Sequence, residues 1–111
     1  MDNTQYTADA HKVARELSLT KRFSRYIAGV EIRSGGALGG AYTNVTLHNG
    51  YSIAITTIND DYGDMFTIVA YVTPADDALP TRDNIVKTES GPVKDLKKTL
   101  GDIVETIAKS N

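Results

Sequence analysis

The sequence predicts a two-layer α+β sandwich, in which an antiparallel sheet carries an N-terminal and a C-terminal helix on the same face. Apolar residues recur with helical spacing near both ends of the chain, and residues between them alternate with the period of two typical of strands. The Asn49-Gly50 pair lies between two alternating runs and marks a hairpin. Helices that flank an antiparallel meander in sequence usually pack together on one of its faces.

Length and composition indicate one globular domain. The chain has 111 residues, of which 41% are hydrophobic and 23% charged, so one core is expected and a disordered or coiled-coil chain is not. We expect residues 1–111 to form a single domain in which residues 1–6 are a flexible N-terminus. Twelve Lys and Arg against 14 Asp and Glu give a net charge of −2, which produces no global field that attracts nucleic acid or anionic membranes.

The residue content also argues against several kinds of chemistry and location. Without cysteine there is no disulfide, thiol nucleophile or thiolate metal site, and two histidines offer little for a metal or a catalytic triad. The first residues lack the basic and apolar regions of a secretory signal. The longest apolar runs, such as Phe66–Val72, are too short to cross a membrane. We therefore expect a cytoplasmic protein with no membrane partner, no cofactor and no metal.

The first helix is expected over residues 8–19. Thr7 can cap it, and the apolar residues that follow recur at the spacing of one buried stripe. The next segment contains Leu19 and Phe23, which either extend the helix by a turn or cover an edge of the core. The stripe consists of Ala10, Val13, Ala14 and Leu17.

Alternating segments predict the strands. Residues 25–33 form the first, and the glycine-rich segment 34–41 ends it. Met65–Thr73 has β-branched and aromatic residues on both faces, as a central strand does, and Pro74 ends it. Further strands are expected over Tyr42–His48, Tyr51–Ile58 and, as a short fifth strand, 84–88.

The Asn49-Gly50 pair predicts the register of the central hairpin. Both central positions of a type I′ turn need positive φ, which Asn and Gly tolerate. A two-residue loop would place Thr46 opposite Ile53, and Val45 opposite Ala54. Both sides of the hairpin are then mixed in polarity. This predicts a sheet with helices on one face and a partly apolar second face that can meet a partner.

The second helix is expected over residues 92–109. Pro92 suits the first helical turn, where its missing N–H is no loss. Gly101 inside the helix is unfavourable and therefore marks close packing against the first helix or the sheet. The apolar stripe of this helix consists of Val93, Leu96, Leu100, Ile103, Val104 and Ile107.

Two loop segments invite functional readings. The glycine-rich segment 34–41 is followed by a strand and contains no lysine, whereas a phosphate-binding loop precedes a helix. A plain hairpin connection is favoured, and a flap that orders on a partner with Leu38 at its apolar tip is the alternative. The acidic segment 59–64 does not match an EF-hand and reads as a solvated turn rather than a metal site.

Two groups of basic residues are candidate anion or nucleic-acid sites. The first lies among the aromatic residues Phe23, Tyr26 and Tyr42, an arrangement that single-stranded nucleic acid needs for phosphate contacts and stacking. The second lies near the positive end of the predicted second helix, where free backbone N–H groups attract anions. Solvated or ion-paired side chains are the simpler reading of both. The first group is Lys21, Arg22, Arg25 and Arg33, and the second is Lys94, Lys97 and Lys98.

The absence of catalytic motifs favours a non-enzymatic protein-binding module. Surplus apolar and aromatic residues on both sheet faces point to an inhibitor, adaptor or accessory subunit of the kind that phages or mobile elements encode. Its partner is another protein, with a homodimer through the open face or edge of the sheet as one form. The first alternative is a nucleic-acid-binding accessory protein, and the second a domain that binds an anion or small ligand. The expected protein-binding anchors are Leu38, Tyr42, Tyr51 and Tyr62.

Overall fold

The described residues form two α-helices, a short 3₁₀ turn and one five-stranded sheet. A computed structural model describes the backbone of residues 4–35, 40–60, 63–72 and 84–109, and the side chains of residues 10–33, 42–57, 65–72 and 84–109. In chain order the elements are α1 (Thr4–Ser18), β1 (Ile27–Gly35), β2 (Gly40–Leu47), β3 (Tyr51–Asp60), β4 (Gly63–Val72), β5 (Ile85–Pro92), a 3₁₀ turn (Val93–Asp95) and α2 (Leu96–Ala108).

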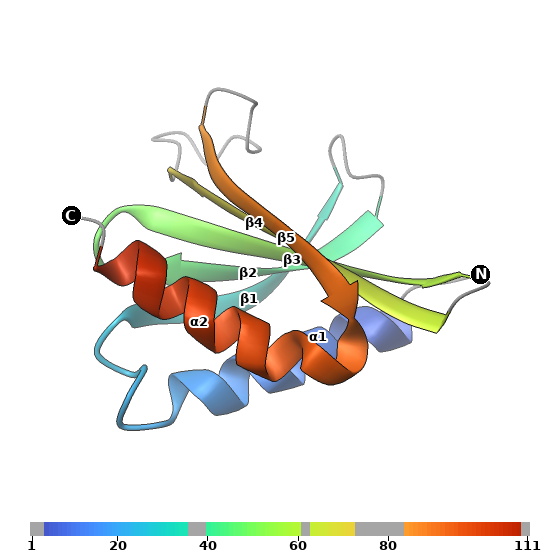
Figure 1. Ribbon diagram of the computed structural model, residues 1–111, viewed down its shortest axis with the longest axis horizontal. Helices are drawn as coiled ribbons and strands as arrows, with labels where there is room; N and C mark the ends of the chain where they lie inside the picture. Colours follow the sequence, from blue (N-terminus) through green and yellow to red (C-terminus); the bar gives the residue numbers. More distant parts are fainter. Residues whose placement is uncertain (1–3, 36–39, 61–62, 73–83, 110–111) are drawn as a thin grey trace.

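The strands form an antiparallel meander in the spatial order β1-β2-β3-β4-β5. Both helices lie on the same face of this sheet (Figure 1). α1 packs against β1, β2 and β3, while α2 packs against α1, β4 and β5. The predicted α+β sandwich is therefore confirmed. α1 begins at Thr4, so residues 4–6 of the segment expected to be flexible belong to the helix.

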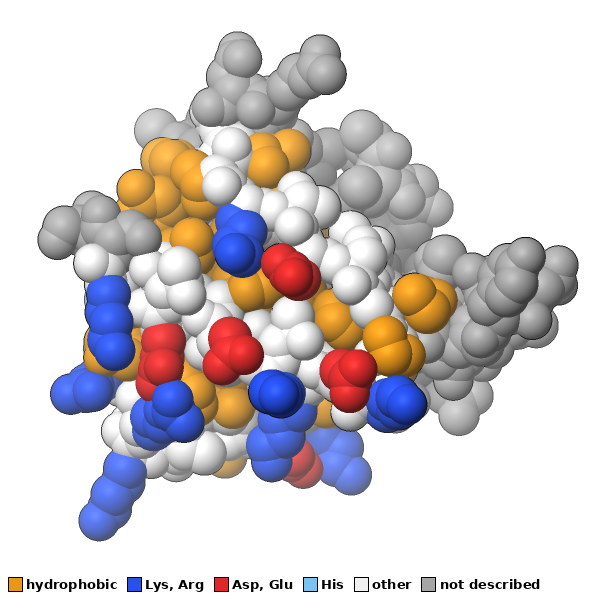
Figure 2. All heavy atoms as spheres, in the orientation of Figure 1, with side chains coloured by type: hydrophobic (Ala, Val, Ile, Leu, Met, Phe, Trp, Pro, Cys, Tyr) orange, Lys and Arg blue, Asp and Glu red, His pale blue; other side chains and the backbone are white. Residues whose placement is uncertain are grey.

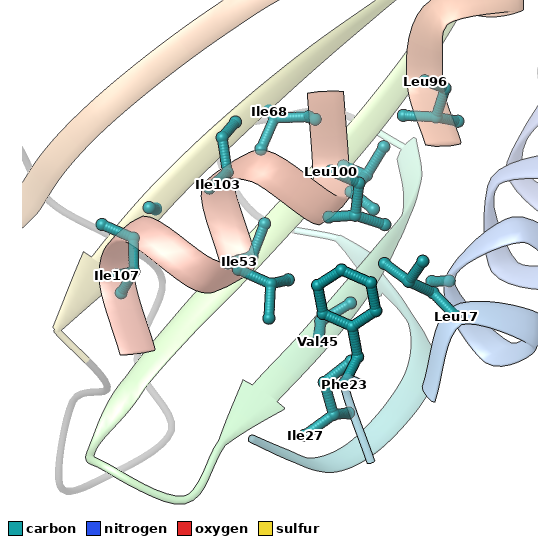
Figure 3. Packing of buried hydrophobic residues seen from close by; sticks show 14 of the residues in the cluster. Leu17, Phe23, Ile27, Val45, Ile53, Ile68, Leu96, Leu100, Ile103 and Ile107 are labelled. Carbon is teal, nitrogen blue, oxygen red and sulfur yellow. The ribbon is translucent and has the colours of Figure 1, made fainter. Parts of the chain in front are cut away.

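The core lies between the helices and the sheet. Alternate strand residues such as Val45, Ile53 and Ile68 point toward the helices, and each is completely buried. Leu100 and Val104 of α2 meet them from the helix layer. Figure 3 shows the ring of Phe23 near the side chains of Leu17, Val45 and Leu100. The apolar residues that recur with helical and strand periods in the sequence thus form one cluster in the structure.

The connection between α1 and β1 covers one edge of this core. α1 ends at Ser18 rather than running on, and tight turns follow it, with Ser24 N–H donating to Thr20 O at 2.9 Å. Phe23 is buried between Leu17 and Leu100 (Figure 3). Leu19, in contrast, is 77% exposed. The segment was expected either to extend the first helix or to cover an edge of the core. It covers the core, and of its two large apolar residues only Phe23 is buried.

The central hairpin differs from its predicted register by one residue. Val45 pairs with Ile53, and Thr46 with Ser52. The connection is His48 to Gly50, one residue longer than a type I′ turn, and Gly50 takes φ 90°. A three-residue loop with glycine in the left-handed region is the next most common hairpin. In the observed register Val45 lies opposite Ile53 on the helix side. A shift of one residue would turn the side chains of one of the two strands to the opposite face, so the apolar residues of β2 and β3 would no longer share the helix side.

The junction between β5 and α2 also differs from the prediction. Gly91 and Pro92 pair with Phe66 and Met65 of β4, so β5 continues four residues beyond the expected end at residue 88. Pro92 has the extended backbone of a strand, with ψ 145°, and α2 begins at Leu96. Proline is tolerated here because β5 is an edge strand. Strand pairing therefore overrides the local signal for a helix start.

The face of the sheet opposite the helices has a buried polar centre. Tyr42, Ala54 and Tyr71 form a small second cluster and are at most 3% exposed. The Tyr71 hydroxyl donates to Oδ1 of the buried Asn44 at 2.5 Å. A partly apolar second face was expected, and its apolar residues are present but inaccessible in the middle of the sheet. The exposed large apolar side chains of the described strands are Ile32 of β1, Val72 at the end of β4, and Ile85 and Val86 of β5.

Candidate functional site

The β5 strand is the most accessible regular element of the described structure. Every residue from Ile85 to Ser90 is exposed, on both faces of the strand. β5 is the last strand of the sheet and pairs with β4, and no described residue pairs with its outer side. An edge strand of this kind presents a row of backbone N–H and C=O groups that another strand can bind.

Exposed aliphatic side chains gather where β5 begins. Val86 is 50% exposed and Ile85 39%, and Val72 at the end of the neighbouring β4 is 44% exposed. The two strands are joined there by the bond from Val72 N–H to Asn84 O, 2.9 Å long. We refer to these three exposed side chains, all near the end of the sheet where β4 ends and β5 begins, as the apolar patch. We call the exposed residues Ile85 to Ser90 the β5 edge.

A groove runs between the β5 edge and α2. It encloses about 160 Å³ and is largely polar. Figure 2 shows the molecular face that carries these two elements, with acidic and basic side chains interspersed on it and Lys and Arg gathered along its lower margin. A strand added to β5 would run alongside this groove. Its walls are Lys87 and Glu89 from β5 and Thr99, Asp102, Ile103 and Thr106 from α2.

The expected protein-binding anchors lie elsewhere. Tyr42 is buried in the second cluster at 3% exposure. Tyr51 is half-buried and packs against the main core on the helix side. Leu38 and Tyr62 lie outside the described residues. The two described tyrosines thus support the sheet and do not present an exposed aromatic surface.

The structure brings the two predicted basic groups together at a second site. Arg22, from the connection before β1, and Lys97 and Lys98, from α2, line one pocket of about 130 Å³. Lys21 and Arg25 are exposed on the same connection. Asp102 also lines the pocket, and Arg22 is ion-paired with Glu105. This basic pocket is therefore partly neutralised from within.

The aromatic residues of this region are not available for stacking with bases. Phe23 is buried, and the Arg22 guanidinium lies 5.1 Å from the centre of its ring. Tyr26 is half-buried against the core, and Arg25 lies 4.8 Å from its ring centre. The basic and aromatic residues expected to cooperate in binding nucleic acid instead contact each other. What remains accessible is positive charge.

The other two basic candidates are separate from this pocket. Arg33 lies on β1, where Nη2 is 2.7 Å from the Glu31 carboxylate, and only 27% of its side chain is exposed. That ion pair raises the pKa of Arg33. Lys94 is exposed on the 3₁₀ turn before α2 and does not line the pocket.

The Arg22–Glu105 pair links the α1–β1 connection to α2. A hydrogen bond from Nε of Arg22 to the carboxylate lowers the pKa of Glu105 and raises that of Arg22. Both groups are solvent-accessible, so water screens this interaction. Arg22 is therefore ion-paired, and the other basic residues that line the pocket are Lys97 and Lys98.

Metal, membrane and family comparisons give no assignment. The described residues contain no group of three side chains suited to hold a metal ion. Neither described helix combines the length and the apolar character needed to span a bilayer. Comparison with protein-family models, with curated proteins and with solved structures finds no match to this chain. Function must therefore be inferred from the surfaces themselves.

Sequence reasoning did not identify the β5 edge as a site. The signal was the run Ile85-Val86-Lys87-Thr88-Glu89-Ser90, in which adjacent aliphatic residues precede alternating charged and hydroxyl residues. Alternating charge is typical of an edge strand, because charged side chains protect an edge from indiscriminate pairing. The sequence predicted only a short fifth strand over residues 84–88 and did not place it at an edge of the sheet, so no binding role was expected for it.

Proposed function

We propose that this protein is a non-enzymatic, cytoplasmic protein-binding module that binds its partner by strand addition along the β5 edge. The observation that carries this proposal is the exposure of every residue from Ile85 to Ser90 on a strand whose outer side no described residue covers. In strand addition, backbone hydrogen bonds supply affinity and alternate side-chain contacts supply specificity. An inhibitor, adaptor or accessory subunit could act in this way.

The surroundings of β5 support this mode of binding. The apolar patch of Val72, Ile85 and Val86 offers an anchor on the edge, and the groove between β5 and α2 can receive side chains of the added strand. The groove is polar, so polar or charged side chains suit it best. We expect the partner to present an extended segment that places an apolar residue against the patch and a polar one in the groove.

The test uses two matched edge variants. Val86 on β5 and Ile32 on β1 are each 50% exposed aliphatic residues on the two edge strands. At either edge, replacing an exposed aliphatic residue by lysine removes an apolar contact and adds an unpaired charge, which disfavours strand addition. Val86→Lys and Ile32→Lys therefore change charge and exposed apolar area alike but at opposite edges. Both are checked for native folding by circular dichroism and melting temperature before use.

The immobilised protein and both variants are then incubated with cell extract, and retained proteins are quantified by mass spectrometry. We expect a partner that is retained by the wild type and by Ile32→Lys but lost with Val86→Lys. Hydrogen exchange of the complex should show new protection in β5. Retention that is equal for both variants, or loss with Ile32→Lys instead, would contradict the proposal, as would the absence of any retained protein, a second copy of this chain included.

Nucleic-acid binding is a second candidate function, and the convergence of Arg22, Lys97 and Lys98 on one pocket favours it. Because the nearby rings are covered by arginines, such binding would use phosphates and would not read sequence. Its affinity would fall steeply with salt.

Fluorescence anisotropy with labelled single-stranded and duplex DNA across a salt series tests this second candidate. If it is correct, Lys97→Glu weakens binding, whereas the same charge change at the exposed Lys12 of α1 has a smaller effect. Undetectable binding at low salt, or equal loss with both variants, would exclude a site at this pocket.

A further inference from the structure

We propose that the partner accepted by the β5 edge is a second copy of this chain, bound antiparallel with β5 against β5 about a two-fold axis at Thr88. This inference depends on the proposed function and names the occupant of the same edge. Two copies joined in this way would form one continuous ten-stranded sheet, since each contributes five strands. The two-fold axis would stand perpendicular to the sheet and keep all four helices on one face.

The charge pattern of β5 carries the proposal. Lys87 and Glu89 are two residues apart and therefore point to the same face of the strand. With Thr88 on the axis, Lys87 lies opposite Glu89 of the second copy, and Glu89 lies opposite its Lys87. Opposite charges facing each other across antiparallel strands are favourable, and like charges are not.

Other registers lose this match. Moving the axis by one residue sets Lys87 opposite itself in the second copy or sets Glu89 opposite itself. An axis placed between two neighbouring residues puts both charged residues opposite uncharged ones. An in-register parallel pairing puts Lys87 beside Lys87 of the second copy. The remaining contacts of the Thr88 register are also compatible with a sheet. Thr88 faces its own copy, a threonine pair of the kind that stabilises strands.

The two charges are available for such pairing. Lys87 Nζ and Glu89 Oε2 are 4.0 Å apart, the outer limit of an ion pair, and the side chains are 43% and 45% exposed. A pair held this loosely in one copy can exchange partners at low cost. The groove beside these residues also contains Asp102 of α2, which adds negative charge near the position that Lys87 of a second copy would take.

The opposite edge of the sheet has the same sequence pattern but not the same availability. Glu31 and Arg33 on β1 are also two residues apart, yet they already form a close pair at 2.7 Å. Arg33 has a further interaction within the protein and is largely covered. The same exchange of charges through β1 would have to break the close Glu31–Arg33 pair. The geometry therefore favours β5 as the self-complementary edge.

The test is the oligomeric state in solution, measured by sedimentation equilibrium from about 10 μM to about 1 mM, because a single edge pairing buries a small area and is weak. The wild type is expected to dimerise reversibly. Lys87→Glu and Glu89→Lys each create two facing like-charge pairs and should weaken the dimer about tenfold or more. The matched control is Glu31→Lys, a charge reversal on the other edge, which should leave dimerisation unchanged.

Two restoring combinations make the register testable. In an equimolar mixture of Lys87→Glu and Glu89→Lys, every facing pair of the heterodimer is again opposite in charge, so the mixture should associate although neither variant does alone. The double variant Lys87→Glu/Glu89→Lys exchanges the charges within one chain and should dimerise like the wild type. Failure of both combinations, with the singles monomeric and folded, would overturn the proposed register.

The outcomes also separate this inference from the proposed function. A wild type that stays monomeric at all concentrations, while a captured partner is still lost with Val86→Lys, overturns self-pairing and leaves strand addition by another protein standing. A dimer that resists both β5 charge reversals, or that Glu31→Lys dissociates, overturns self-pairing at β5. If capture is also insensitive to Val86→Lys, the proposed function falls as well.

Discussion

At the scale of single residues, Gly101 and Phe23 fit against each other across the core. A Cβ on Gly101 would lie 3.2 Å from Cζ and 3.7 Å from Cε2 of Phe23. The sequence predicted close packing at this glycine against the first helix or the sheet, whereas the contact is with the connection between them. Phe23 can enter the core at this point because the helix surface lacks a side chain there.

Gly101→Val should therefore destabilise the protein by about 1–3 kcal/mol, because the added methyl groups overlap a buried ring. Urea unfolding followed by circular dichroism measures the change. Gly29→Val on β1 is the control, since no atom lies within 4 Å of a Cβ at Gly29, and it should change stability by less than about 0.5 kcal/mol. Equal losses at the two glycines would refute the packing argument.

The buried hydroxyl of Thr57 is expected to destabilise the core. Oγ1 of Thr57 has no hydrogen-bond partner within the described part of the chain, and the residue is 1% exposed. Thr57→Val keeps the shape and removes the desolvated hydroxyl, so it should raise the free energy of unfolding by about 1–2 kcal/mol. Thr43 is equally buried but has an interaction partner. Thr43→Val should lower stability in the same assay, and the reverse order would contradict the assignment.

The Arg22–Glu105 pair predicts a pH dependence with a definite sign. The pKa of Glu105 is lowered in the folded protein from an ordinary value of 4.5. A lowered carboxyl pKa contributes stability above the ordinary value, and that contribution is lost as the pH falls through the folded value. The melting temperature of Glu105→Gln should lie below that of the wild type at pH 7.

The two melting temperatures should converge as the pH falls below 4.5. Because both side chains are accessible to solvent, high salt at pH 7 should also shrink the difference. A difference that persists unchanged in acid would show that the glutamine variant acts through packing and not through charge.

At the scale of elements, Asn49 joins the central hairpin to the end of α2. Its Nδ2 donates to the carbonyl of Ile107 at 3.1 Å, while its Oδ1 accepts from Tyr51 N–H at 3.3 Å. The last carbonyls of a helix have no partner within the helix, so this side chain satisfies one of them. The turn that the sequence marked as a hairpin thus also fixes the second helix.

Two substitutions separate the roles of Asn49. Asn49→Ala loses both bonds and should cost about 0.5–1.5 kcal/mol. Asn49→Asp keeps the acceptor for Tyr51 but places negative charge against the negative end of a helix, so it should cost at least as much at pH 7. Equilibrium unfolding gives both values. An aspartate variant as stable as the wild type would show that the bond to Ile107 contributes nothing.

At the scale of the whole molecule, one cluster contains residues of α1, α2 and β1–β4. Neither helix has a separate core of its own within the described residues, so we expect the helices and the sheet to unfold together. Unfolding transitions followed by far-ultraviolet circular dichroism and by tyrosine fluorescence should coincide, as two-state behaviour requires. An early loss of helical signal, with the tyrosine environment intact, would show that the helix layer is independent.

Much of the fold could be predicted from the sequence, because helical and strand periods are local properties. The stripes of α1 and α2 and the alternation of the strands placed the elements within a few residues of their observed ends. The errors arose where pairing decided the outcome. Gly91 and Pro92 resemble a helix start, but their pairing with β4 extends β5. The hairpin register also differs from the prediction, because the pairing of Val45 with Ile53 requires a three-residue connection and not the two-residue turn that Asn49-Gly50 favours.

The candidate site was less predictable, because accessibility is a property of the whole sheet. Tyr42 has the same local pattern as an exposed strand tyrosine, and only its neighbours across the sheet bury it. Arg22 and Lys97 are distant in sequence, and the packing of α2 beside the α1–β1 connection brings them to one pocket. The residues of β5 are ordinary as a sequence and become a candidate binding edge because β5 is last in the sheet.

The sequence by itself determined the class of fold, the approximate positions of the two described α-helices and the absence of cysteine, since these depend on composition and on periods within short segments. The tertiary structure decided the hairpin register, the order of the strands and therefore which strand has a free side. The physical reason is that local propensity selects an element, whereas burial of apolar area across elements selects its neighbours.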